Sequence, residues 1–210
     1  MNKVIGIISY LPDDKEKRKI REEKIASLID ICNELFDLPI MIVAQNWKDF
    51  DIECCQLYKY DSPLGIIKAR NTLRDIFLDS GYEYLIMLDD DCELTGDIES
   101  AEKYLSEIDS HPGGFGTWSG TLLKLFAISK EIFIEEDFGK GSVENGDYFE
   151  DILFVNTLLK KYPDKHFQFD KKINLKEKSN NFNDENSTWF YGQYNKHDIG
   201  DRTREILSRI

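Results

Sequence analysis

The sequence predicts an α/β protein in which helices flank a central, mostly parallel β-sheet. Two observations carry this prediction. Short apolar runs that are typical of buried strands alternate with longer stretches of helical periodicity through the first half of the chain. The length of 210 residues is that of one α/β domain with a single folding unit. We therefore expect one domain, whose ligands bind beyond the carboxyl ends of the strands.

The first elements are a βα unit and two further strands. Residues 4–8 form a buried-strand run, residues 12–14 read as a turn that starts a helix, and apolar residues then recur at helical spacing as far as Leu35. Residues 39–44 predict a second strand, and residues 52–60 are a weaker, alternating candidate for a third.

The next two elements are the clearest in the sequence. Residues 66–80 have helical periodicity, and Gly81 ends the pattern as a glycine commonly ends a helix. Residues 84–88 are an unbroken apolar strand that runs directly into Asp89, Asp90 and Asp91.

The second half is less regular. We expect a helix over residues 96–108, a strand over 122–129 and a glycine-rich loop over 139–146, and no internal repeat emerges. A helix over 147–162 and a last strand over 167–169 complete the domain. Residues 176–186 are so rich in Lys, Glu, Ser and Asn that we expect a flexible segment, and the aromatic run that follows predicts a lid within 176–210.

Composition excludes several classes of protein. The formal net charge of −13 argues against electrostatic capture of nucleic acid or an anionic membrane, and the basic run at 15–21 reads as a solvated helix face. No stretch approaches the roughly 18 apolar residues of a membrane span, and the amino terminus does not resemble a signal peptide. We therefore expect a cytoplasmic protein. Because no cysteine pair has CxxC spacing, the four cysteines read as reduced packing residues rather than zinc ligands.

The aspartate run is the candidate site. Carboxylates this close repel one another, and a bound cation would offset the cost. Mg²⁺ and Mn²⁺ favour such oxygen ligands. They typically take one or two protein carboxylates and complete their coordination shell with water and substrate phosphates, so a diphosphate is the expected partner. The alternative reading is a solvated acidic turn at the end of a strand.

Two segments around this run resemble a known family. Gly65-Ile66-Ile67-Lys68-Ala69-Arg70-Asn71-Thr72-Leu73, followed by residues 81–91, is similar to the central block of family 2 glycosyltransferases with the GT-A fold and its D-x-D motif. The likeness extends more loosely over the first 160 residues. It implies a catalytic domain over 1–175, with a nucleotide-sugar half at 1–95 and an acceptor half at 96–175.

The resemblance also implies roles for single residues. Asp89 and Asp91 would hold the metal, and Asp90 would reach the donor ribose or the metal through water. Arg70 would lie near the donor nucleotide, with Ser9 and Tyr10 near its base. The plain alternatives are that Arg70 pairs with Asp75 on the surface and that Tyr10 belongs to the core.

The catalytic base implied by the resemblance is Asp151, with Glu150 and Asp147 as alternatives. A single carboxylate that takes the acceptor proton predicts transfer with inversion. His197 is a candidate for a further metal or phosphate contact, with Lys196 as its alternative. An ordinary acid in the first turn of a helix and an exposed histidine are the plain readings of these positions.

The resemblance therefore implies a glycosyltransferase, either a hexosyltransferase or a related transferase. It would move a sugar from a nucleotide-diphosphate donor, with a uridine diphosphate sugar expected, to an acceptor hydroxyl with Mn²⁺ or Mg²⁺ as cofactor. The acceptor stays open between a glycan, a protein, a wall polymer and a modified base. The alternatives are a haloacid-dehalogenase-like phosphatase, a nucleotidyltransferase, and a non-catalytic metal- or carbohydrate-binding module.

Overall fold

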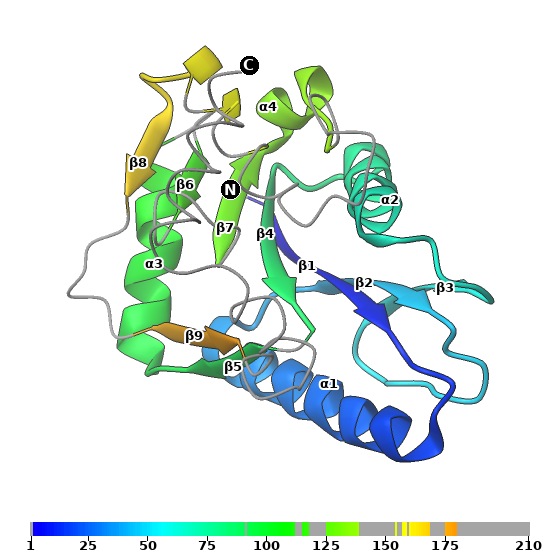
Figure 1. The fold of residues 1–210 in the computed structure, drawn as a ribbon. Helices are drawn as coiled ribbons and strands as arrows, with labels where there is room; N and C mark the ends of the chain where they lie inside the picture. Colours follow the sequence, from blue (N-terminus) through cyan, green and yellow to red (C-terminus); the bar gives the residue numbers. More distant parts are fainter. Residues whose placement is uncertain are drawn as a thin grey trace, which may run out of the picture.

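The structure is a computed structural model that describes residues 2–90, 92–111, 115–117, 125–138, 154, 157–158, 160–168 and 175–179 (Figure 1). The elements of these residues, in chain order, are β1 (Lys3–Tyr10), α1 (Lys15–Phe36), β2 (Ile40–Gln45), β3 (Gln56–Tyr60), α2 (Ile66–Asp79), β4 (Tyr84–Asp89), β5 (Cys92–Thr95), α3 (Ile98–Ser110), β6 (Phe115–Thr117), β7 (Phe126–Ser129), α4 (Lys130–Glu135), β8 (His166–Gln168) and β9 (Lys176–Ser179).

The described strands form a large sheet in the order β3-β2-β1-β4-β7-β6-β8 and a small one in which β5 pairs with β9. Strands β1 to β4 are parallel to one another, β7 runs antiparallel to β4 and β6, and β8 is parallel to β6. The predicted α/β class with a mostly parallel sheet is confirmed.

The direction of winding reverses at β1. From β1 the chain moves outward through α1 to β2 and then β3, and it returns through α2 to β4 on the other side of β1. Because βαβ crossovers are right-handed, this reversal puts α1 and α2 on opposite faces of the sheet. The loops that follow β1 and β4 diverge there, which leaves a crevice between them.

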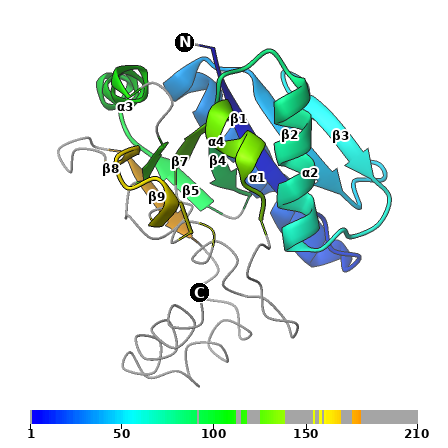
Figure 2. The same ribbon diagram turned by 90° about the horizontal axis from the view of Figure 1, so that it is seen from above.

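Alternating strand residues divide the core between the two faces. Ile5 and Ile7 of β1 belong to the cluster that α1 and α3 cover, whereas Val4 belongs to the cluster that α2 and α4 cover. Figure 2 shows α2 and α4 together on one side of the strands. The sheet is thus the middle layer of three.

Gly6 lets α2 lie close to the sheet. A Cβ at this position would come within 2.6 Å of Leu85 Cδ1 and 2.9 Å of Leu73 Cδ2, closer than real Cβ atoms approach other atoms. Both leucines are fully buried. A side chain at this position would therefore force these two buried leucines to move.

Short polar side chains set the starts of three helices. Asp14 accepts a hydrogen bond from Lys17 N at 2.9 Å, Asp97 from Ser100 N at 2.8 Å, and the Ser129 hydroxyl from Ile132 N at 3.4 Å. These caps satisfy amide groups that have no partner inside their helices. The third helix begins at Ile98 rather than near Gly96 because Asp97 is its cap.

Several elements differ from the sequence expectation, and the short strands β5 and β6 were not predicted. The third strand begins at Gln56, not Ile52. Helix α4 was not predicted, because its six residues are too few for a periodic pattern. Residues 176–179, expected to be flexible, form β9 and pair with β5. The rest of the predicted lid lies outside the described residues.

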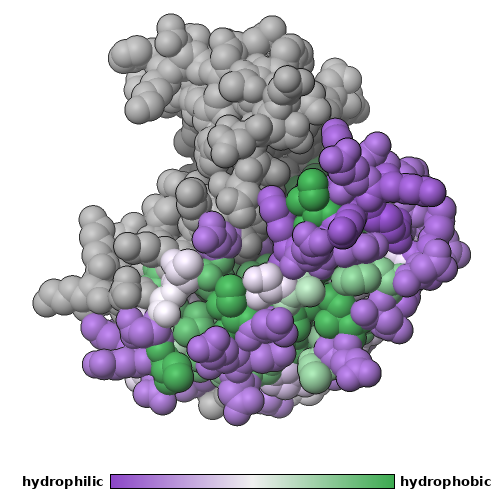
Figure 3. All heavy atoms as spheres, turned by 90° about the horizontal axis from the view of Figure 1, so that it is seen from below, coloured by the Kyte–Doolittle hydropathy of each residue, from purple (hydrophilic) through white to green (hydrophobic). Residues whose placement is uncertain are grey.

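The face of the molecule seen from below carries many hydrophilic side chains among the described residues (Figure 3). Figure 3 shows polar residues around most of the rim of the face seen from below, with hydrophobic residues in a band between them. The large hydrophobic side chains that stand exposed are those of Tyr10, Ile20, Ile66, Ile98 and Ile134. None of the helices among the described residues combines the length and the apolar character that a membrane span requires.

Candidate functional site

A pocket of about 390 Å³ lies at the crevice between β1 and β4. Ile8 and Tyr10 of β1, Gln45 at the end of β2 and Asp89 at the end of β4 form one part of its wall. The other lining residues are Arg21 of α1, Asp90, Pro63 and Gly65 before α2, and Ile66 and Arg70 in the first two turns of α2. The pocket therefore occupies the carboxyl edge of the sheet, where the fold class predicted a ligand.

Strand register brings its residues to one level. Ile8 lies opposite Asp89 in the β1–β4 pair, and Tyr10 lies opposite Gln45 in the β1–β2 pair. Residues that are 35 positions apart (Tyr10 and Gln45) or 81 positions apart (Ile8 and Asp89) consequently meet at one edge.

Asp89 is held by a buried arginine. Arg70 Nη2 lies 3.4 Å from Asp89 Oδ1, and the side chain of Arg70 is 4% exposed while that of Asp89 is 40% exposed. The Arg70 guanidinium also lies 5.7 Å from the centre of the Phe138 ring. The surface pairing considered for this arginine is made instead by Arg74, whose Nη1 lies 2.7 Å from Asp75 Oδ1. Arg70 thus lines the pocket instead of pairing on the outer surface.

Asp90 is held from the opposite face of the sheet. Arg21 Nη1 of α1 donates to Asp90 Oδ1 at 2.9 Å, and the backbone N–H of Tyr10 donates to Asp90 Oδ2 at 3.3 Å. Both carboxylate oxygens therefore have partners. Tyr10 itself is 38% exposed and lines the pocket, so it is not a core residue.

Two amide side chains tie together the loops around the pocket. Gln45 Oε1 accepts from Leu64 N at 2.8 Å, which fixes the loop before α2. Asn46 Nδ2 donates to Leu11 O at 2.8 Å and to Asp13 Oδ1 at 3.0 Å, which fixes the loop after β1. Asn46 has a φ of 61°, in the left-handed region that asparagine tolerates better than most residues. These hydrogen bonds therefore hold the loops around the pocket in place in the absence of a ligand.

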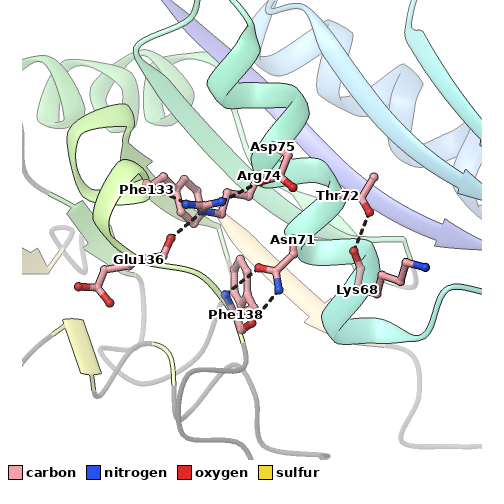
Figure 4. A network of polar contacts seen from close by, with 8 residues as sticks. All are labelled: Lys68, Asn71, Thr72, Arg74, Asp75, Phe133, Glu136 and Phe138. Carbon is pink, nitrogen blue, oxygen red and sulfur yellow. Dashed lines mark hydrogen bonds and ion pairs between the residues drawn. The ribbon is translucent and has the colours of Figure 1, made fainter.

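The Ala-Arg-Asn segment of α2, residues 69–71, has a structural role in addition to the contact between Arg70 and Asp89. Asn71 Nδ2 donates to Phe138 O at 2.7 Å, and Phe138 N donates to Asn71 Oδ1 at 2.8 Å (Figure 4). Arg74 Nε donates to Phe133 O at 2.9 Å and to Glu136 O at 2.7 Å. These bonds fasten the end of α4 and the segment after it onto α2, which positions the Phe138 ring beside Arg70.

A buried carboxylate lies beyond this network. The side chain of Glu136 is 2% exposed, and its Oε1 accepts from Lys161 Nζ at 2.7 Å and from the Tyr162 hydroxyl at 3.0 Å. Burial, together with the Glu136 hydrogen bond and charge, raises the pKa of Tyr162 to about 12. Phe154, Leu158 and Lys161 are helical, in agreement with the helix predicted over 147–162.

The structure brings four of the predicted site residues into one pocket, namely Tyr10, Arg70, Asp89 and Asp90. It does not place Ser9 there: this side chain is 1% exposed, and its hydroxyl has no hydrogen-bond partner among the described residues. The predicted contact of Ser9 with the base stays a prediction. The other predicted site residues, which lie outside the described residues, are Asp91, Asp147, Glu150, Asp151, Lys196 and His197.

Sequence reasoning missed Arg21 and Gln45. The basic run at 15–21 was read as a solvated face, yet its last residue turns toward the pocket. Their positions in the predicted elements could have indicated both residues. Gln45 ends β2 and Arg21 lies in the first turns of α1, and both places belong to the carboxyl edge of a parallel sheet.

The chemistry of the pocket fits a divalent cation only in part. The described residues contain no group of three or more His, Cys, Asp or Glu side chains that could hold a metal ion. Asp89 nevertheless offers a half-exposed carboxylate to the pocket, and Mg²⁺ or Mn²⁺ commonly takes one or two protein carboxylates and completes its shell with water and phosphate oxygens. The donor type fits, with Asp91 as the predicted second ligand.

A second hollow of about 710 Å³ lies at the opposite edge of the sheet, near the amino ends of β2 and β3. Tyr58, Tyr82, Met41 and Asp79 are among its lining residues. Because no basic residue is among its described lining residues, this hollow is a poorer match for a phosphate ligand than the carboxyl-edge pocket.

No protein-family model matches the sequence, and no curated protein is similar enough to match it. Solved structures do share the fold. TarS 1–349 from S. aureus superposes with a TM-score of 0.56 at 13% identity, over 83% of this chain and 60% of TarS 1–349. The same protein in complex with UDP-GlcNAc gives a TM-score of 0.54 at 14% identity, over 83% of this chain and 58% of the other.

A protein from Desulfovibrio desulfuricans G20 described as a nucleotide-diphospho-sugar transferase gives a TM-score of 0.51 at 11% identity, over 80% of both chains. The chain thus has the fold of nucleotide-diphospho-sugar transferase domains, and it spans about three fifths of TarS 1–349. At these identities the similarity concerns the fold alone.

Proposed function

We propose that the chain is a glycosyltransferase that moves a sugar from a nucleotide-diphosphate donor, most simply a uridine diphosphate sugar, to an acceptor hydroxyl. The observation that carries the proposal is the carboxyl-edge pocket, in which two aspartates, two arginines and a half-exposed tyrosine meet at the switch point of the sheet. The fold is similar to that of TarS, a protein solved with UDP-GlcNAc and with UDP.

Each described residue suits one part of such a donor. The ring of Tyr10 offers an aromatic surface for the nucleobase, and Arg70 offers a guanidinium for a phosphate or for the base edge. Asp89, with Asp91 as the predicted second ligand, would hold Mn²⁺ or Mg²⁺, which offsets charge on a leaving diphosphate when it is bound. The further predicted contact from His197 belongs to the same proposal.

The acceptor half of the proposal rests on the family resemblance. Asp151, or Glu150 in its place, would take the proton of the acceptor hydroxyl as its oxygen attacks the sugar carbon and the diphosphate leaves. This single displacement inverts the anomeric centre. NMR of the product tests it, because retention of configuration would remove Asp151 from this role.

The first experiment is a binding screen. We expect one nucleoside diphosphate among UDP, GDP and CDP to bind in the presence of Mn²⁺, because the pocket and the family resemblance both favour a nucleoside diphosphate as ligand. A ligand at 100 times its dissociation constant stabilises the folded state by about 2.7 kcal/mol, which thermal shift measures and calorimetry verifies.

Asp91→Ala is the informative variant of this screen, with Asp79→Ala as a control from the opposite edge of the sheet. Loss of metal-dependent binding in Asp91→Ala alone supports the proposal. If no nucleotide binds with or without metal, the donor site is refuted and the phosphatase and the non-catalytic module take its place. Metal binding without any nucleotide dependence favours the non-catalytic module.

A further inference from the structure

Arg21 is the charged residue of the pocket for which the proposed function has no role. It belongs to a basic run on α1, yet its side chain behaves differently from its neighbour on the same helix. Lys19 is 78% exposed and lies 3.9 Å from Glu23, whereas Arg21 is 29% exposed and lies 2.9 Å from Asp90, which is 14% exposed. Arg21 is thus directed into the site.

The pocket carries balanced charge as a result. Its charged lining residues are two aspartates and two arginines, and the arginines come from helices on opposite faces of the sheet. Arg70 lies beside Asp89 and Arg21 beside Asp90. The negative charges of Asp89 and Asp90, for which the sequence suggested a bound cation, are therefore each partly neutralised by an arginine side chain.

A guanidinium in this position has unused capacity. Arginine has five N–H donors in a planar fork, and within the part of the chain that the structure describes the Arg21–Asp90 contact uses one of its terminal nitrogens. A guanidinium that is partly exposed in a pocket matches the paired oxygens of a phosphate. The carboxylate of Asp90 meanwhile fixes the guanidinium before any ligand arrives.

We propose that Arg21 binds a phosphate group of the donor and that this pocket therefore accepts a diphosphate without any metal. The choice of a diphosphate rests on the proposed function. The same arginine opposes cation binding at Asp90, because its positive charge lies at hydrogen-bond distance from that carboxylate. Arg21 thus has opposite effects on the two ligands of one site.

The test uses inorganic pyrophosphate and Mn²⁺ as separate probes on the full chain. Calorimetry measures pyrophosphate in the presence of a chelator and, in a second titration, Mn²⁺ without any phosphate. We expect Arg21→Gln to weaken pyrophosphate binding about tenfold, as expected for loss of a charge-assisted hydrogen bond, and to tighten Mn²⁺ binding severalfold.

Lys19→Gln is the matched control, because it removes the same charge from the same helix at an exposed position. We expect it to change neither affinity by more than about twofold, since exposed charges are screened by salt. Equal losses of pyrophosphate binding in both variants would overturn the proposal. They would indicate that the summed positive charge of α1, and not a contact of Arg21, attracts pyrophosphate.

Two further outcomes also contradict the proposal. One is an unchanged pyrophosphate affinity in folded Arg21→Gln. If that variant does not fold, Arg21→Met replaces it, since it also removes the charged hydrogen-bond donor, and unchanged affinity there contradicts the proposal equally. The other is a native chain that binds no pyrophosphate without metal. That result leaves Mn²⁺-dependent nucleotide binding untouched, so failure here is distinct from failure of the proposed function.

Discussion

At the scale of single residues, Asn71 is the clearest case of a side chain that replaces backbone pairing. Its amide both donates to and accepts from the backbone of Phe138. We expect Asn71→Ala to lower the free energy of unfolding by about 1–3 kcal/mol, because it leaves a part-buried N–H and C=O without these partners. Denaturant unfolding followed by circular dichroism measures the change.

Thr72 provides the matched control for this prediction. It is the next residue of α2, and its hydroxyl donates to Lys68 O at 2.8 Å within the same helix (Figure 4). Such back-bonding contributes little to stability. We expect Thr72→Ala to stay within about 0.5 kcal/mol of the native chain. Equal destabilisation by both substitutions would show that the Asn71–Phe138 contact is not special.

The sequence could predict some site residues and not others for a physical reason. Asp89 and Asp90 follow the clearest apolar strand, so their place at a carboxyl edge follows from local pattern alone. The partner of Asp90 does not, because Arg21 and Asp90 are 69 positions apart and meet only after α1 has packed on the sheet. The buried position of Ser9 likewise depends on which face of β1 the helices cover.

At the scale of elements, the contact of α2 with the sheet depends on Gly6. We expect Gly6→Ala to lower the free energy of unfolding by about 1–3 kcal/mol, because the new methyl group would overlap Leu85 and Leu73 in a closely packed layer. Gly81→Ala is the control, since a Cβ there meets nothing within 4 Å. A native-like melting temperature for Gly6→Ala would mean that α2 can move away from the sheet without cost.

Elements differ in how well local pattern predicts them. The apolar runs of β1, β2 and β4 are buried on both faces and were predictable from composition. The β5–β9 pair was not, because its strands are short and largely polar. Its stability comes from non-local terms: the strands pair in antiparallel register, and Leu94 and Leu175 join the core covered by α1 and α3.

At the scale of the whole molecule, the order of the strands determines where a ligand can bind. The reversal at β1 separates the loops after β1 and β4, and a cavity that combines acids, arginines and an aromatic ring lies there. The fold class was predictable because alternating strands and helices leave few arrangements. The exact site was not, since it also depends on side chains from both faces of the sheet.

The most direct test of the proposed donor site determines whether the nucleotide binds in the carboxyl-edge pocket or in the hollow at the opposite edge of the sheet. Calorimetric titration of the nucleoside diphosphate selected by the screen would compare Tyr10→Ala, in the carboxyl-edge pocket, with Tyr58→Ala, in the hollow at the other edge. Stacking of a base on an aromatic ring contributes about 1–3 kcal/mol, so we predict at least a fivefold weaker affinity for Tyr10→Ala and no change for Tyr58→Ala. Unchanged affinity in Tyr10→Ala, or an equal loss in both variants, would contradict a donor site at the carboxyl edge.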